Sequence, residues 1–381
     1  MLDYTKKIDL AIVCIPARFI TGVIKECGEK GIKNMVIISA GFSEIGNNKL
    51  SEEVKKTAGK YDVKIIGPNC LGIINTKNKL NASFFKGIPV YNPVAFVSQS
   101  GALGVAILDK AIKIGQGFSK FVSMGNMLNT DFADIINYLN NDEETEVICL
   151  YIEGLKDGSG FLEVLKKCRK PVIVLKAGKS KAGMRAASSH TGSLAGAQAV
   201  YKGVFRQGGA IEVNTLEEMF KLAEIFEQYG KIKDKKVCIL TNAGGPGVLA
   251  SDACEQFGLT VPVLPMKIKK ELNKVLPISW SHNNPIDVVG DAPAERYEKS
   301  LKILSNTDFY DILLCLLTPQ DMTEPEKTSR AVIDFHKKHK NVFTCFMGGY
   351  SVDKSKKMLE KNGIINFEEP YDFARIFSKM F

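Results

Sequence analysis

The sequence predicts an α/β protein built from parallel, doubly wound sheets. Short apolar runs alternate along the chain with helical patterns, and each run is continuously apolar, which is typical of strands covered on both faces. This alternation favours parallel sheets with helices on both sides. We expect strands at 11–15, 35–38, 94–97, 147–152, 172–175, 237–240, 312–317 and 342–346, and helices at 20–28, 103–114, 132–140, 216–228, 248–257 and 326–338.

The composition is that of a globular protein. Of 381 residues, 45% are hydrophobic and 24% are charged, which excludes a disordered or fibrous chain. The net charge of +9 is a mild bias, and the lysine clusters lack interleaved aromatic residues, so we expect no nucleic-acid partner. No apolar run approaches the ~20 residues of a membrane span and the start is no signal peptide, so we expect a cytoplasmic protein without a membrane partner.

The nine cysteines show no Cys-x-x-Cys pair and no Cys/His ligand spacing. Most lie in apolar runs, where cysteine acts as a small buried hydrophobe. We therefore expect reduced thiols and no metal site.

An internal repeat divides the chain. Val97–Val105 aligns with Leu240–Val248, and each copy reads as a strand, a turn of tiny residues and then a helix. The repeat predicts two similar domains, at 89–229 and 230–381, joined by a polar, lysine-rich stretch. Residues 1–88 form a third piece with too few strands for a complete doubly wound domain.

The two repeated turns are candidate phosphate sites. Small residues let a ligand approach the backbone, and free amides at a helix start attract anions. The residues concerned are Ser98, Gln99, Ser100 and Gly101 in the first copy and Ala243, Gly244, Gly245 and Gly247 in the second. Glycines that only allow close strand–helix packing are an equal alternative for each copy. Neither turn fits a dinucleotide fingerprint, and Ile173 stands where a P-loop ending at Gly178-Lys179-Ser180 needs its first glycine.

His190 is the candidate catalytic residue. It lies in a segment of small and basic residues, 176–196, which we interpret as a loop, and no acidic residue occurs between Glu163 and Glu212. Such a stretch attracts anions. Of the other three histidines, His336 and His339 are expected to face solvent and His282 to lie in a loop. An exposed loop histidine without function is the alternative for His190.

A neutral imidazole can attack a phosphoryl group and hold it covalently. The phosphoramidate would need amide-rich surroundings, which two helix starts could supply. A carboxylate would fix the ring tautomer, and Glu153, just past the strand at 147–152, is the candidate, with a salt bridge or cap as the alternative. The turn at 67–72 follows a strand and could simply join two domains. Cys70 within it has no basic partner nearby in sequence and is not expected to be a nucleophile.

These motifs resemble those of the NDP-forming acyl-CoA synthetases, in particular the α part of ADP-forming acetyl-CoA synthetase, and more distantly succinyl-CoA synthetase. The segments that show this resemblance are residues 36–42, 67–72, 98–102, 188–196, 241–247 and 284–288. The resemblance implies a truncated Rossmann-like CoA-binding domain followed by two flavodoxin-like domains with doubly wound parallel sheets.

The resemblance also implies a reaction. Phosphate would attack acyl-CoA to give acyl phosphate and CoA, and a carrier histidine, His190, would pass the phosphoryl group to ADP. Glu153 would orient the ring, and the two turns would hold the phosphohistidine. Binding of CoA and of the acyl group would involve Pro16, Ser39, Gly41, Pro68, Asn69 and Cys70. ADP or ATP and Mg²⁺ would lie mainly on an ATP-grasp β subunit, which predicts a hetero-oligomer.

The chain departs from the family pattern where it begins. The strand and glycine-rich loop that open the family's CoA-binding domain have no counterpart, so we expect the N-terminal part of that domain to be missing. A non-catalytic scaffold or CoA-metabolite-binding subunit is therefore the alternative function. A flavodoxin-like FMN binder is a third, and no aromatic-flanked phosphate loop supports it.

Overall fold

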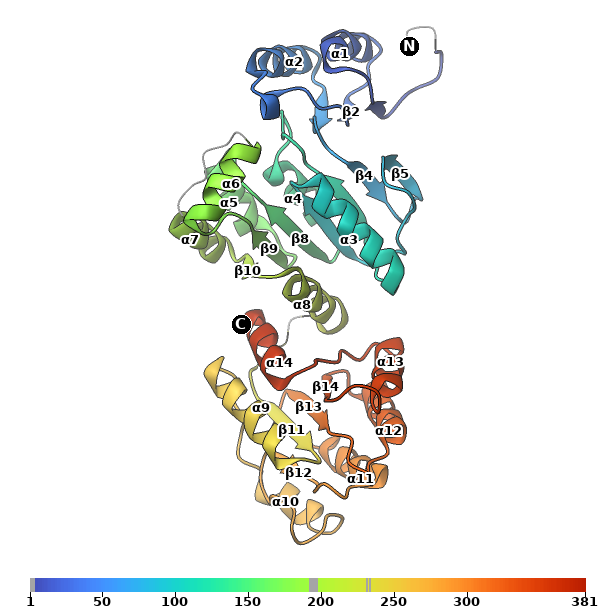
Figure 1. Cartoon of the computed structure of the whole chain (residues 1–381), viewed down its shortest axis with the longest axis vertical. Coiled ribbons are helices and arrows are strands. Elements are labelled where there is room, and N and C mark those ends of the chain that lie inside the picture. The colour runs from blue at the N-terminus through green and yellow to red at the C-terminus, as the bar shows by residue number, and fades with distance from the viewer. Residues whose placement is uncertain (1–3, 192–197, 231, 233) are drawn as a thin grey trace. The chain divides into compact units, whose positions relative to one another are not determined.

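The computed structural model describes residues 4–191, 198–230, 232 and 234–381, and the side chains of Ile114 and of residues 187–191 lie outside this description. The chain divides into two compact units, Met1–Ala223 and Glu224–Phe381 (Figure 1). The α/β architecture predicted from the sequence is confirmed in both. Within the described residues, no helix is both long and apolar enough to serve as a membrane span.

Unit 1 begins with a three-stranded parallel sheet in the order β1-β2-β3. Apolar residues at helical spacing, such as Ile20, Ile24 and Cys27, pack the following helix onto this sheet. The elements are β1 (Ala11–Val13), η1 (Ala17–Phe19), α1 (Ile20–Glu29), β2 (Asn34–Ile37), η2 (Ser43–Ile45), α2 (Asn48–Tyr61) and β3 (Lys64–Ile66).

A seven-stranded sheet follows, in the order β10-β9-β8-β6-β7-β4-β5. Strands β6 to β10 are parallel and have the flavodoxin-like order. The strands are β4 (Gly72–Asn75), β5 (Leu80–Ser83), β6 (Val94–Ser98), β7 (Lys120–Ser123), β8 (Val147–Ile152), β9 (Val172–Lys176) and β10 (Ile211–Val213). The sheet is not purely parallel as predicted, because β4 pairs antiparallel with β5 and with β7. This hairpin lies within residues 1–88, yet it extends the sheet of the next domain.

Helices cover both faces of the seven-stranded sheet in Figure 1. Aromatic side chains contribute to their packing: Phe220 contacts Phe96 and Phe118, with ring centroids 5.8 and 6.1 Å apart. The helices are α3 (Gly101–Ile114), α4 (Phe132–Asn140), α5 (Gly158–Lys167), α6 (Lys181–Thr191), α7 (Gln198–Gly208) and α8 (Leu216–Tyr229).

Unit 2 has a four-stranded parallel sheet in the order β12-β11-β13-β14. Its strands are β11 (Val237–Thr241), β12 (Ile286–Asp287), β13 (Ile312–Leu317) and β14 (Val342–Phe346). Its helices are α9 (Gly244–Gln256), α10 (Met266–Leu272), α11 (Ala294–Leu304), α12 (Pro325–Lys338), α13 (Asp353–Lys361), α14 (Pro370–Phe377) and η3 (Ser378–Met380). The repeated turn of this unit lies between its first strand, β11, and α9, as the turn of unit 1 lies between β6 and α3.

The expectation that His336 faces solvent is wrong. Its side chain is only 6% exposed, because it lies on the buried face of α12 with Val332 and Phe335. His339 is half-buried, with its ring 4.8 Å from that of Phe335. His282 lies in a loop, as predicted, and its Nε2 is 2.9 Å from the carbonyl oxygen of Ile278.

Candidate functional site

The first repeated turn joins β6 to α3. Ser98 is fully buried, and its hydroxyl donates to the carbonyl oxygen of Ser100 (2.8 Å) and accepts from the Ser100 N–H (3.2 Å). Ser100 caps the helix, since its hydroxyl accepts from the N–H of Leu103 (3.3 Å). These contacts hold the positive end of α3 at the edge where the parallel strands end.

The second repeated turn joins β11 to α9 in unit 2. The Thr241 hydroxyl donates to the carbonyl oxygen of Ala243 and accepts from its N–H, both at 3.0 Å. Ala243 is the N-cap of α9 and offers no side-chain cap. Asn242 is fully buried, and its amide Nδ2 donates to the carbonyl oxygen of Thr318 (2.9 Å).

The glycines of the two turns serve different purposes. A Cβ atom on Gly104 would lie 2.5 Å from the Phe121 ring, so this glycine is required for helix–strand packing. A Cβ atom on Gly101 would make only ordinary contacts of 3.6 Å or more, and one on Gly245 would meet nothing within 4 Å. Cβ atoms on Gly244 and Gly247 would make close contacts of 3.3 and 3.2 Å, so packing explains Gly104 and contributes at these two positions, but it does not explain Gly101 or Gly245.

Gln99 and Glu153, both predicted site residues, lie together. The amide oxygen of Gln99 accepts hydrogen bonds from the backbone N–H groups of Glu153 (2.8 Å) and Gly154 (3.0 Å). Lys176, at the end of β9, donates from Nζ to the carbonyl oxygen of Glu153 (2.8 Å). The amide oxygen of Gln99 thus binds the protein backbone, and Glu153 is held beside the start of α3.

The residues predicted to bind CoA and the acyl group gather at one edge of the three-stranded sheet. Pro16, Ser39 with Gly41, and Pro68 with Asn69 follow β1, β2 and β3 respectively. The N–H of Asn69 donates to the carbonyl oxygen of Ser39 (2.9 Å), which ties two of these turns together. The ends of parallel strands form the usual ligand crevice of such sheets.

Cys70 is buried beneath this edge. Its side chain is 4% exposed, and its Sγ lies 3.4 Å from the carbonyl oxygen of Ile37. Burial raises the pKa of Cys70 to about 12, so the thiol stays protonated at neutral pH. A Cβ atom on Gly67 would lie 2.4 Å from the same carbonyl oxygen, so only glycine fits there.

Residues that the sequence analysis missed join this edge to the seven-stranded sheet. Asn126 donates from its backbone N–H to the carbonyl oxygen of Pro68 (2.9 Å) and from its side chain to Glu44 (2.5 Å). Although burial opposes ionisation, hydrogen bonds from Gly41, Asn126 and Phe42 hold the pKa of Glu44 below its usual value. The motif Gly125-Asn126, which follows the end of β7 after one residue, is the sequence feature from which this contact could have been predicted.

The N–H of Leu71 donates to the Ser123 hydroxyl (2.9 Å), and the backbone of Leu71 is the nearest neighbour of the Gly101 Cβ position. The predicted acyl site and the first repeated turn are therefore adjacent within unit 1.

His190 lies in the last turn of α6, and its side chain is outside the described residues. The interpretation of 176–196 as a loop is wrong for Lys181–Thr191. Ser180 starts this helix, since its hydroxyl accepts from the Gly183 N–H (3.0 Å), and alanine, arginine and methionine favour helix. The helix lies against η2, near Glu44. One of the basic residues before it, Lys179, pairs with Glu212 (2.6 Å).

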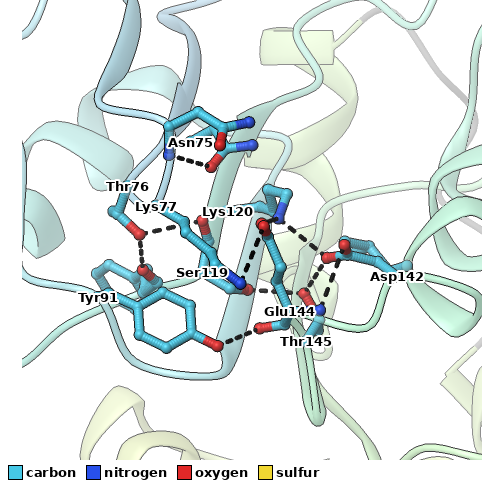
Figure 2. Close-up of polar contacts among 12 residues, drawn as sticks. Asn75, Thr76, Lys77, Tyr91, Ser119, Lys120, Asp142, Glu144 and Thr145 are labelled. Atoms are coloured by element: carbon cyan, nitrogen blue, oxygen red, sulfur yellow. Dashed lines mark hydrogen bonds and ion pairs between the residues drawn. The ribbon is translucent and has the colours of Figure 1, made fainter.

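A separate polar cluster lies at the opposite edge of the seven-stranded sheet (Figure 2). Lys120 is buried between Asp142 (3.0 Å) and Glu144 (2.5 Å), and Thr145 donates to Asp142 (2.6 Å). A cavity of about 660 Å³ borders this cluster, and no predicted site residue lines it. Lys77 also lies 3.5 Å from Glu144, so two lysines balance the two carboxylates and we interpret the cluster as structural.

Three family models match the chain in order: a CoA binding domain at residues 2–76, a succinyl-CoA ligase like flavodoxin domain at 92–226 and a ligase-CoA domain at 237–374.

Among curated relatives, acetate–CoA ligase [ADP-forming] II subunit alpha of Pyrococcus furiosus is 46% identical over 97% of this chain and 82% of its own length. Acetate–CoA ligase [ADP-forming] I of Archaeoglobus fulgidus is 44% identical over 99% of this chain, which spans only 55% of that protein. A solved structure, dinucleotide forming acetyl-coenzyme A synthetase 1 of Ca. Korarchaeum cryptofilum in complex with phosphate and ADP, is 32% identical with a TM-score of 0.93, covering 100% of this chain and 83% of that one. The chain therefore belongs to the NDP-forming acyl-CoA synthetase family.

Proposed function

We propose that the chain is the acyl-transferring subunit of an ADP-forming acyl-CoA synthetase, with acetyl-CoA as the first substrate to test. A phosphate oxygen attacks the thioester carbonyl and the CoA thiolate leaves, which gives an acyl phosphate. A ring nitrogen of His190 then attacks phosphorus and the carboxylate leaves. An oxygen of the ADP β-phosphate takes the phosphoryl group from His190, which yields ATP.

The observation that supports this function best is the contact between Gln99 and the backbone of Glu153. It holds a carboxylate beside a helix start of the type that binds phosphoryl groups. The Glu153 carboxylate would accept a hydrogen bond from the ring N–H of His190 and so fix the tautomer of the ring. The first turn, 98–101, and the second, 243–247, would each stabilise the phosphohistidine through backbone N–H groups.

We also propose the division into domains at 1–88, 89–229 and 230–381. The CoA-binding model ends at residue 76, and the next two models begin at 92 and 237, which supports these divisions. Pro16, Ser39, Gly41, Pro68, Asn69 and Cys70 would line the CoA and acyl site.

The nucleotide and Mg²⁺ would lie on an ATP-grasp β subunit in a hetero-oligomer in the cytoplasm. A relative named as a subunit alpha supports the partner subunit, and a solved relative described in complex with phosphate and ADP supports the two ligands.

The test uses acetyl phosphate labelled with ³²P, because this donor needs no partner subunit. The chain is expected to take up acid-labile, base-stable phosphate on His190, and His190→Asn is expected to abolish the label. His282→Asn is the matched control, since His282 is a loop residue of unit 2. Retention of label by His190→Asn would overturn the proposal. A folded chain that binds acyl-CoA and never takes label would instead indicate the scaffold function.

A further inference from the structure

The seven-stranded sheet of unit 1 and the four-stranded sheet of unit 2 have equivalent residue positions around their repeated turns. The residues at these positions can therefore be compared between the two sheets. In unit 1, Gln99 accepts from the N–H of Glu153; in unit 2, Asn242 accepts from the N–H of Thr318 (2.9 Å). Glu153 and Thr318 each follow the strand next to the repeated turn. They are therefore equivalent positions.

The equivalence extends to the next strand. Lys176 pairs in register with Ile152, the residue before Glu153, and Phe346 pairs in register with Leu317, the residue before Thr318. The first copy thus places a lysine where the second places a buried phenylalanine.

The two copies hold the same peptide groups by different donors. In unit 2, Asn242 alone does both tasks: it accepts from the N–H of Thr318 and donates to its carbonyl oxygen (2.9 Å). In unit 1, Gln99 accepts from the N–H of Glu153, and the Lys176 ammonium donates to its carbonyl oxygen (2.8 Å). A neutral amide is therefore sufficient for the geometry, and the ammonium adds a charge.

That charge is buried. Lys176 is only 3% exposed, and burying a cation is unfavourable unless partners compensate for the lost water. Its Nζ lies 4.5 Å from the centre of the Tyr201 ring, and the Tyr201 hydroxyl in turn accepts from the N–H of Leu155 (3.2 Å). The charged groups that act on Lys176 are Glu153, Lys179 and Glu212, and the last two pair with each other.

We propose that Lys176 is a positioning residue for Glu153, which fixes its peptide group and places a buried positive charge near its carboxylate. This inference rests on the proposed function. In the proposed function Glu153 would accept a hydrogen bond from the His190 ring, so Lys176 would act on phosphoryl transfer through Glu153 without touching phosphate.

Two substitutions separate geometry from charge. Lys176→Met removes the donor and the charge, and Lys176→Gln keeps a neutral donor of the kind that Asn242 provides. We expect Lys176→Met to slow phosphorylation of His190 by acetyl phosphate about 10- to 100-fold in single-turnover measurements. Lys176→Gln is expected to reduce this phosphorylation rate less than Lys176→Met does. It is also expected to move the acid limb of the pH–rate profile to higher pH, because a carboxylate without a nearby cation protonates more readily.

The matched control is Lys170→Met, at the other end of β9. Lys170 also donates to two backbone carbonyl oxygens, of Leu139 (2.6 Å) and Asp142 (2.5 Å), and lies far from Glu153 along the strand. The Lys170→Met variant is expected to be phosphorylated on His190 by acetyl phosphate at the wild-type rate. Circular dichroism on each variant checks folding, and Lys176→Gln keeps the test valid where Lys176→Met fails to fold.

A double mutant completes the test. If Lys176 acts through Glu153, then Lys176→Gln combined with Glu153→Gln is expected to be no slower than Glu153→Gln alone. Additive losses, or a wild-type rate and pH profile in both Lys176 variants, would overturn this inference and leave the proposed function standing. A wild-type chain that takes no label would overturn both.

Discussion

Ser98 and Thr241 make the same two hydrogen bonds, each within its own unit. Each hydroxyl donates to the carbonyl oxygen and accepts from the N–H of the residue two positions later. Both residues are buried at the end of the first parallel strand of their sheet. A hydroxyl at this position therefore closes the turn that presents the helix start.

Removing either hydroxyl is expected to destabilise the unit that contains it. Ser98→Ala and Thr241→Val each leave the N–H and C=O of the turn without their partner, at a cost of about 1–3 kcal/mol in the free energy of unfolding. Urea denaturation measures this loss, and amide exchange at Ser100 or Ala243 assigns it to one unit. Thr241→Ser keeps the hydroxyl and serves as the control. Equal losses from Thr241→Ser and Thr241→Val would show that the hydroxyl is not responsible.

Cys70 and Cys14 are expected to differ sharply in reactivity. Burial raises the pKa of Cys70 to about 12, whereas Cys14 is exposed. Only the thiolate reacts, so Cys70 in the folded chain should be alkylated by iodoacetamide at pH 8 roughly 10³-fold more slowly than an ordinary thiol of pKa ~8.5. Mass spectrometry of peptides after timed quenching measures both rates. In denaturant the two cysteines are expected to react alike, and rapid labelling of Cys70 in the folded chain would contradict its burial.

The strands were predictable because each is a continuous apolar run, as at 147–152 and 312–317. The helix at Asn48–Tyr61 was missed since its buried face carries only Ser51, Val54 and Ala58 among many lysines and glutamates. The β4–β5 hairpin was missed because Leu80–Ser83 is polar and gains its place by pairing with β4. Weakly apolar segments therefore depend on their neighbours for their structure.

The site was predictable where its residues are contiguous in sequence. The turns at 98–101 and 243–247 and the position of Glu153 after a strand could be recognised from local pattern. Lys176 and Glu44 could not be recognised in this way, because their positions in the sequence are ordinary. Lys176 gains its role through its contact with Glu153, and Glu44 gains its role through its contact with Asn126. The burial of His336 was hidden in the same way.

Lys120 is expected to stabilise unit 1 through its two carboxylate partners, shown in Figure 2. Lys120→Met removes the buried cation that Asp142 and Glu144 share and leaves the exposed Lys77 beside Glu144, and we expect a loss of about 2–4 kcal/mol in unfolding free energy at pH 7. Although burial opposes it, hydrogen bonds from Thr145 and Lys120 hold the pKa of Asp142 below its usual value. The stabilisation is thus present above the unfolded pKa of ~3.9 and is lost as the pH falls through the folded value.

Urea denaturation of both proteins at pH 7 and at about pH 2.5, below the unfolded pKa, checks this. The difference between wild type and Lys120→Met should be smaller at the lower pH, where the carboxylates begin to protonate. Lys77→Met is a suitable control, because Lys77 approaches Glu144 to 3.5 Å from an exposed position. A difference that stays constant with pH would indicate lost packing of the lysine stem rather than lost charge.

His336 is expected to make unit 2 less stable in mild acid. Burial and the nearby Lys340 lower its pKa, and within the described part of the chain its Nδ1 has no hydrogen-bond partner. The ring lies 6.3 Å from that of Tyr229, in an edge contact. The unfolded chain, with a histidine pKa of ~6.5, takes up the proton first as the pH falls, so stability is fully present above that value and decreases below it. The slope cannot exceed about 1.4 kcal/mol per pH unit for one proton.

Urea denaturation of the full chain between pH 5 and 8 should show this slope in the unfolding of unit 2, and His336→Leu should flatten it. His282→Asn is the control, because His282 is a loop residue whose substitution leaves the buried ring in place. An undiminished slope in His336→Leu would mean that another group takes up the proton.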